Sequence, residues 1–101
     1  MMPTRTAISR NGVPIRLTDE RWSHVLRDHP EVADYVEDVL LAIAEPDEIR
    51  AGDWGALISL RLLNRLYLTV VYRETALGDG FIITAYLARR PMVRTILWTR
   101  A

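Results

Sequence analysis

The stretch ALISLRLLNRLYLTVVYRETALGDGFIITAYLA, residues 56–88, consists of three short apolar runs separated by turn residues. Each run is rich in β-branched and aromatic residues, which favour strands. A fourth run of this kind, MVRTILW, covers residues 92–98 and follows Arg89-Arg90-Pro91. Because short connections join neighbouring antiparallel strands, the pattern predicts about four consecutive antiparallel strands from residue 56 to residue 98.

Two helices are predicted upstream of these strands. Thr18 suits the N-cap of a helix that begins at residue 19, since its hydroxyl can accept a hydrogen bond from a first-turn amide. That helix should end at His29-Pro30, because proline disfavours the helical conformation of the preceding residue. Apolar residues at spacings of three and four between residues 32 and 43 predict a second helix, which ends at Glu45-Pro46. We therefore expect an α+β fold with both helices on one face of the antiparallel sheet.

The first residues of the chain contain a hairpin signal. Asn11-Gly12 favours a tight turn, and the runs on both sides of it alternate apolar and polar residues. Pro14 would place the second of these runs at an edge of the sheet. We expect either a hairpin or a flexible arm over residues 1–12, in front of a core that covers residues 13–98. A length of 101 residues fits a single domain.

The composition restricts the compartment and the chemistry. The chain has no cysteine, which excludes disulfides, thiolate metal ligands and a cysteine nucleophile, and which suits a reducing cytoplasm. The N-terminal residues lack the apolar core of a signal peptide, and no apolar run has the roughly 18 residues of a membrane span. We expect a soluble cytoplasmic protein that does not contact membranes.

Charge is distributed unevenly along a chain whose net charge is zero. Residues 1–50 contain six arginines and ten acidic residues, whereas residues 51–101 contain seven arginines and three acidic residues; there is no lysine. The basic half could clamp a polyanion, because guanidinium binds phosphate through two parallel hydrogen bonds. The other interpretation is that an acidic, solvated helix lies beside a sheet whose basic residues are all arginine.

The chain has two histidines, both in the first predicted helix. His29 shares an apolar stripe with Val25, whereas His24 lies nearly opposite among charged residues. His29 is therefore expected to meet the core or the edge of the sheet, and His24 is either a surface residue or a catalytic one. The two side chains could reach a common cleft only if the helix ends at the rim of the sheet.

A period of two divides the strand residues between two faces of the sheet. The residues expected to face the helices are Leu60, Leu62, Leu68, Val70, Ile83 and Ala85. The residues expected on the other face are Ser59, Arg61, Tyr67, Thr69, Thr84 and Tyr86. Such a face could hold a phosphate and stack a base. The alternative is that a sheet covered on one side simply turns polar residues toward water.

Five segments together resemble a known group of proteins. They are IRLTDERWSHVLRDHPE (15–31), IAEPDEI (43–49), LYLTVVYRE (66–74), FIITAYLARRP (81–91) and ILW (96–98). This layout resembles the small phage and bacterial domains grouped as barnase, EndoU, colicin D and RelE-like nucleases. The resemblance covers about four fifths of the chain, and its most specific parts are the HPE helix end and the ITAY strand.

The resemblance implies metal-independent cleavage of RNA, in which the ribose 2′-hydroxyl attacks the adjacent phosphate and leaves a cyclic phosphate end. No metal or other cofactor is expected. The expected partners are RNA and an antitoxin or immunity protein, as for a toxin or a phage-derived effector. By position, the catalytic set would combine His24 or His29, a cation from Arg61 or from Arg89 and Arg90, and a hydroxyl from Thr84 or Tyr86. Tyr67, Thr69, Arg89 and Arg90 would contact the RNA.

The chain departs from the group in having no lysine. Because arginine stabilises charge but transfers protons poorly, acid and base chemistry must rest on the histidines. The alternative function is an RNA-binding or protein-binding module that has the same fold without the chemistry. A metal-dependent hydrolase is disfavoured, since two histidines five residues apart do not share a helical face.

Overall fold

A computed structural model describes residues 4–75 and 78–100 of the chain. The helices are α1 (Asp19–Asp28) and α2 (Val36–Ala44), with short 3-10 turns η1 (Pro30–Val32) and η2 (Asp53–Gly55). The strands are β1 (Thr4–Ile8), β2 (Pro14–Thr18), β3 (Glu48–Ala51), β4 (Leu57–Leu63), β5 (Leu66–Glu74), β6 (Gly80–Ala88) and β7 (Ile96–Thr99). The fold is α+β, as the sequence predicts.

The strands of the described residues form one mixed sheet of seven, in the order β1-β2-β6-β5-β4-β3-β7. Strands β4, β5 and β6 are the consecutive antiparallel meander that the three apolar runs predict. The expected number of about four strands is too low. It omits the hairpin from the main sheet and misses β3, whose four residues are too few to show a period-two pattern.

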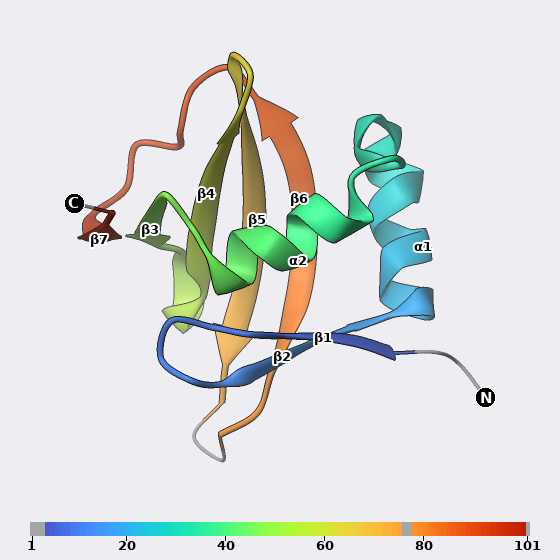
Figure 1. Ribbon diagram of the computed structural model, residues 1–101, viewed down its shortest axis with the longest axis horizontal. Coiled ribbons are helices and arrows are strands. Elements are labelled where there is room, and N and C mark those ends of the chain that lie inside the picture. The colour runs from blue at the N-terminus through green and yellow to red at the C-terminus, as the bar shows by residue number, and fades with distance from the viewer. Residues whose placement is uncertain (1–3, 76–77, 101) are drawn as a thin grey trace.

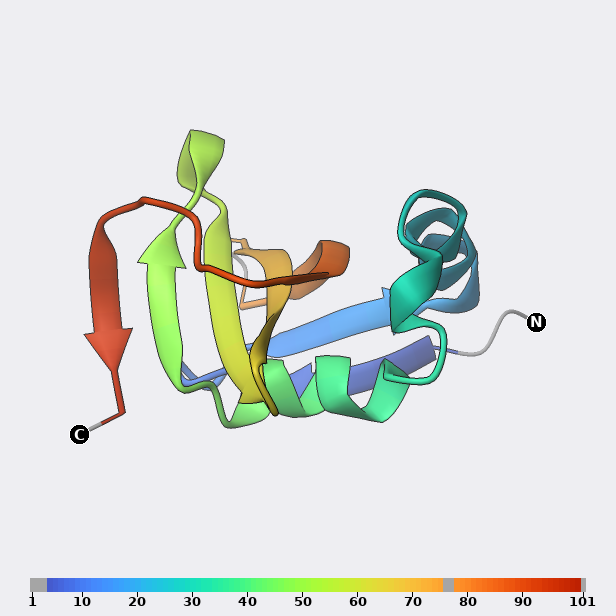
Figure 2. The same ribbon diagram turned by 90° about the horizontal axis from the view of Figure 1, so that it is seen from above.

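Strand β7 differs from the expected meander. It does not pair with β6; residues 89–95 cross to the far side of the sheet, where β7 pairs antiparallel with β3 (Figure 2). The sequence predicts a strand here, but its expected pairing with the preceding strand is wrong, because the connecting segment is long enough to span several strands.

The predicted N-terminal hairpin is present as β1 and β2, which pair antiparallel, and Gly12 takes the positive φ of 79° that its turn requires. Strand β2 lies inside the sheet order, contrary to the edge position that Pro14 suggests. Its pairing with β6 is parallel and covers only Ile15 with Gly80 and Arg16 with Phe81. Pro14 is the first residue of β2, where its missing N–H interrupts no ladder to β6.

The two helices flank the same core from different positions (Figures 1 and 2). Helix α2 covers one face of β5 and β4, whereas α1 lies beside the edge of β6, beyond the point where β2 leaves it. Val25 of α1 and Val32 of η1 still join the core under α2, where they cluster with Val70 and Ala85. The expectation of two helices on one face is therefore only partly met, because α1 lies along the part of β6 that β2 does not pair with.

Local signals set the helix ends. Thr18 accepts a hydrogen bond of 3.0 Å from the Arg21 amide, as predicted for an N-cap, and α1 stops before His29-Pro30. Helix α2 begins four residues later than its apolar spacing suggests. Val32 is fully buried in a 3-10 turn rather than in the helix. The spacing of the apolar residues therefore predicts correctly that Val32 is buried, but not that it lies in an α-helix.

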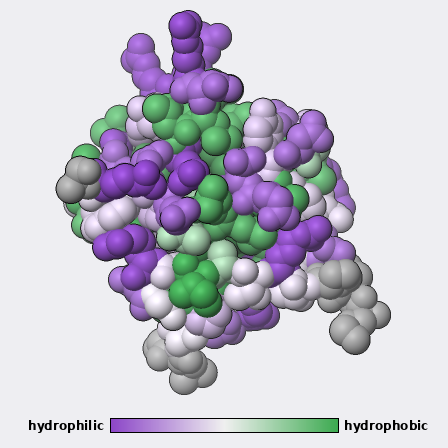
Figure 3. All heavy atoms as spheres, viewed as in Figure 1, coloured by the Kyte–Doolittle hydropathy of each residue, from purple (hydrophilic) through white to green (hydrophobic). Residues whose placement is uncertain are grey.

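The face that carries α2 shows a mixture of polar and apolar side chains (Figure 3). Within residues 4–75 and 78–100, neither helix is long and apolar enough to cross a membrane.

Candidate active site

The sheet register corrects the predicted division of residues between the two faces. Leu60 lies opposite Thr69 and Thr69 opposite Tyr86, so these three side chains share the face away from α2. Ser59 lies on the other face and donates a hydrogen bond of 2.5 Å to the Ala42 carbonyl of α2. The assignment for β4 was therefore wrong by one residue. Leu60 and Ser59 are both buried, so hydrophobicity alone could not set the phase of this strand.

The assignment of Ile83 is also wrong. The register between β5 and β6 shifts after Val71, so that Tyr72 pairs with Ile82 while Val71 pairs with Thr84. Ile83 is the extra residue of this bulge, and it lines two cavities on the face away from α2. A bulge re-aims the side chains beside it, which period-two reasoning does not anticipate.

Both histidines line one cavity of about 360 Å³ between α1 and β6. The residues that form it are Arg21, His24, Val25, Asp28 and His29 on the helix side, and Ile83 and Thr84 on the strand. The helical wheel placed His24 and His29 on nearly opposite sides. His29 escapes that geometry because it is the C-cap, with φ −135° and ψ 68°, at the rim of the sheet.

His29 is the better anchored of the two histidines. Its ring packs against the ring of Tyr86, with centroids 5.4 Å apart and an interplanar angle of 33°. Its Nδ1 atom lies 3.5 Å from a carboxylate oxygen of Glu31. His24 is exposed. One histidine is thus packed against the sheet, and the other is a solvent-exposed residue of the same cavity.

Tyr86, which packs on His29, is also influenced by the positive charge of Arg94. Burial raises the pKa of the Tyr86 phenol, while the nearby positive charge of Arg94 partly opposes that rise. At neutral pH the phenol therefore keeps its proton and can donate a hydrogen bond.

A second cavity of about 250 Å³ adjoins the first at Ile83. Ile58 and Val71 lie in its floor, while the turn at Asp53 and Trp54 and the segment with Met92 and Arg94 border it. We call the two adjoining cavities, on the face away from α2, the sheet groove. It runs from the histidines to the β3–β4 connection.

Arg94 is held by a carboxylate at this end of the groove. Its guanidinium donates two hydrogen bonds to Asp53, of 2.7 and 3.1 Å. These bonds lower the pKa of Asp53 and raise the pKa of Arg94. The cation whose charge acts on the Tyr86 phenol is thereby held by Asp53.

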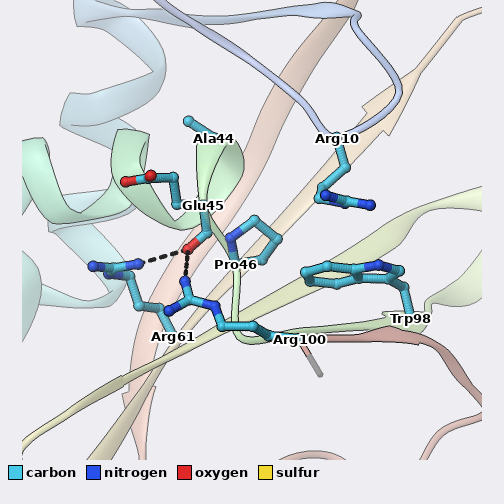
Figure 4. A pocket seen from close by; sticks show the side chains of 7 residues that line it. All are labelled: Arg10, Ala44, Glu45, Pro46, Arg61, Trp98 and Arg100. Atoms are coloured by element: carbon cyan, nitrogen blue, oxygen red, sulfur yellow. Dashed lines mark hydrogen bonds between the residues drawn. The ribbon is translucent and has the colours of Figure 1, made fainter.

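Arg61, a predicted catalytic cation, lies on the opposite face from the histidines. Figure 4 shows it in a pocket at the end of α2, where its Nη1 atom donates a 2.6 Å hydrogen bond to the Glu45 carbonyl. Arg100 donates to the same carbonyl at 3.3 Å, and Arg10 stacks over the ring of Trp98 at 4.1 Å. The structure does not bring Arg61 to the histidine cavity, because the phase of β4 turns it toward α2.

The other predicted site residues have different fates. Thr84 lines the histidine cavity and Tyr86 contacts His29. Thr69 is fully buried, so it offers no surface to RNA, and Tyr67 beside it is half-buried. Arg89 and Arg90 are exposed in the segment after β6, and they are not among the described residues that line the groove.

Sequence reasoning missed the groove arginines Arg21, Arg73 and Arg94 and the groove tryptophan Trp54. Arg21 lies three residues before His24, so the helical spacing of the two was visible in the sequence. Arg94 and Trp54 carried no such signal. Their positions depend on the crossover of residues 89–95 and on a turn between β3 and β4, and neither follows from residue patterns.

The arrangement offers acid–base and electrostatic chemistry. Imidazoles transfer protons near neutral pH, guanidiniums stabilise developing negative charge, and phenol or threonine hydroxyls donate hydrogen bonds. In the part of the chain that the structure describes, no three His, Asp or Glu side chains lie close enough together to hold a metal ion. Comparison of the chain with protein-family models, with curated proteins and with solved structures found no match.

Proposed function

We propose that the protein is an endoribonuclease that cleaves RNA by attack of the 2′-hydroxyl on the adjacent phosphate, without a metal ion. The observation that carries the proposal is the cavity that His24, His29 and Thr84 line together, next to Tyr86. Two histidines in one cavity supply both a proton acceptor and a proton donor, which this reaction needs.

The proposed reaction uses the groove residues as follows. One imidazole takes the proton from the ribose 2′-hydroxyl, the 2′-oxygen forms a bond to phosphorus, and the bond from phosphorus to the 5′-oxygen breaks. The second imidazole, in its protonated form, gives a proton to that leaving oxygen. The products are a 2′,3′-cyclic phosphate and a 5′-hydroxyl. No oxidant, reductant or further reactant takes part.

Charge stabilisation falls to the remaining side chains. A cation near the phosphate and donors aimed at its oxygens stabilise the extra negative charge that develops at phosphorus. Arg21 lines the histidine cavity, and Arg94 lines the adjoining cavity, from which its charge acts on Tyr86. The Tyr86 phenol is protonated at neutral pH, as tyrosines ordinarily are, and burial raises its pKa further, so the phenol can donate a hydrogen bond to a phosphate oxygen.

The alternative is an RNA-binding or protein-binding module with the same groove and no chemistry. The shared cavity of His24, His29 and Thr84, with Tyr86 packed on His29, favours the enzyme, since binding alone does not require two imidazoles in one cavity. A cytoplasmic nuclease of this kind, such as a toxin or a phage-derived effector, would need an antitoxin or immunity protein that blocks the groove.

The test is cleavage of single-stranded RNA by purified protein in the presence of a metal chelator. The wild type, the double variant His24→Ala/His29→Ala and the control Arg61→Ala are purified in parallel, and the product ends are analysed. We expect cyclic phosphate ends with the wild type and with Arg61→Ala, and at least a 100-fold loss with the double variant.

Three outcomes would contradict the proposal. Equal cleavage by the double variant would identify a contaminating nuclease. Activity that disappears in chelator and returns with a divalent cation would require a metal. If the wild type binds RNA but does not cleave it, the alternative function as an RNA-binding module would be supported instead.

A further inference from the structure

Trp54 combines two features that are unfavourable for a folded protein on its own. Its side chain is 91% exposed, although tryptophan is among the largest apolar residues. Its backbone has φ 56° and ψ 37°, in the left-handed region that a bulky side chain rarely adopts. Folding therefore gains little from the ring and is opposed by the backbone conformation.

The turn that carries Trp54 is nevertheless tightly held. Arg73 donates a hydrogen bond of 2.5 Å to the Trp54 carbonyl, and the Ala56 amide donates one of 3.0 Å to the Asp53 carbonyl. The Asp53 side chain is fixed by the two hydrogen bonds from Arg94. The exposed ring is thus mounted on a rigid turn at the end of the sheet groove opposite the histidines.

A strained, exposed aromatic residue beside a groove points to a ligand more than to stability, because strained conformations concentrate at functional sites. The groove wall next to Trp54 contains the guanidiniums of Arg73 and Arg94. Aromatic rings beside cationic side chains are the combination that binds single-stranded nucleic acid, in which the ring stacks on a base and the cations contact phosphates.

We propose that Trp54 is the stacking platform for a nucleobase of single-stranded RNA that lies in the sheet groove. The base would lie on the indole ring while its strand continues past Arg94 toward the histidine cavity. The inference rests on the proposed function for the identity of the polymer. It adds a base-binding position remote from the reacting phosphate, and it predicts that substrates need a base at that position.

The decisive variant is Trp54→Gly, with Trp54→Asn as a second one and Trp54→Phe as a conservative control. Glycine and asparagine accept a positive φ more readily than tryptophan, so both variants should melt at or above the wild-type temperature. Both should bind a single-stranded oligonucleotide roughly 5- to 150-fold more weakly, the range for loss of one stacked base. Trp54→Phe should retain most of the affinity. A structural role would instead lower the melting temperature.

Fluorescence tests the contact directly. In the double variant Trp22→Phe/Trp98→Phe, Trp54 is the single tryptophan. A short oligouridylate should quench its emission, and an abasic oligomer of equal length should not. Equal quenching by both oligomers, or unchanged affinity in Trp54→Gly and Trp54→Asn, would overturn the inference. The same results are expected if Trp54 instead contacts a protein partner.

The experiment separates this inference from the proposed function. Quenching by oligouridylate without any cleavage by the wild type would refute the nuclease and support the base-binding position. Cleavage by the wild type with an unaffected Trp54→Gly variant would support the nuclease and refute the base-binding position.

Discussion

The protein places arginines in two regions on opposite faces of one sheet, and the two sets have different neighbours. On the α2 side, Arg61 and Arg100 both donate to the carbonyl of Glu45, and Arg10 stacks on Trp98 (Figure 4). On the other side, Arg21 lines a cavity with both histidines and Thr84, and Arg94 lines the adjoining cavity and acts electrostatically on the Tyr86 phenol. Among the residues that the structure describes, no histidine or tyrosine lines the α2-side pocket.

The difference teaches that a cation's role is set by what surrounds it. The final carbonyls of a helix lack partners within the helix, and the α2-side arginines satisfy one of them, at Glu45. Pro46 follows directly and has no N–H to offer the helix end. Those arginines therefore stabilise the end of α2, whereas the groove arginines line the cavities of the proposed active site. Variants on the α2 face should change stability, and variants in the groove should change RNA binding or cleavage.

The largest expected effect is on cleavage by His24→Ala. General acid or base catalysis typically contributes 100-fold to 10,000-fold, so the variant should lose activity by that factor. Because His24 is exposed, the free energy of unfolding of the His24→Ala variant should stay within about 0.5 kcal/mol of the wild-type value. Single-turnover cleavage and thermal melting measure the two quantities.

Ser23→Ala, an exposed neighbour on α1, is the matched control and should cleave normally. If His24→Ala is as active as this control in a protein that cleaves RNA, His24 is a surface residue and His29 alone remains for acid–base chemistry.

The next effect compares Arg94→Gln with Arg61→Gln in RNA binding. Each phosphate contact that is lost should reduce the slope of log affinity against log salt by roughly 0.7 on single strands. Arg94→Gln should show that reduction, while Arg61→Gln should keep the wild-type slope because Arg61 faces α2. Titrations at several salt concentrations give both slopes. A reduced slope for Arg61→Gln alone would move RNA binding to the α2 face.

The sequence predicts elements better than it predicts the site, for reasons visible in particular residues. Thr18 and Pro30 act within one turn of chain, so the bounds of α1 follow from local chemistry. The cluster of His29, Tyr86 and Arg94 depends on the edge position of α1, the bulge at Ile83 and the crossover of residues 89–95. These three features depend on contacts between residues far apart in the sequence, so no local sequence pattern predicts them. Arg61 was misplaced because its strand is buried on both faces.

Ser59→Ala should have the smallest effect on RNA cleavage. It should nevertheless lower the free energy of unfolding. The Ala42 carbonyl would ordinarily accept from the amide of residue 46, but that residue is proline, and the buried Ser59 hydroxyl supplies the hydrogen bond instead. Its removal leaves a buried acceptor without that donor, which costs roughly 1 to 3 kcal/mol. Urea unfolding should show this loss, while RNA cleavage below the unfolding transition should equal that of the wild type. Cleavage that falls in a folded Ser59→Ala protein would show that the two faces of the sheet are coupled, and the separation between a structural and a functional set of arginines would then fail.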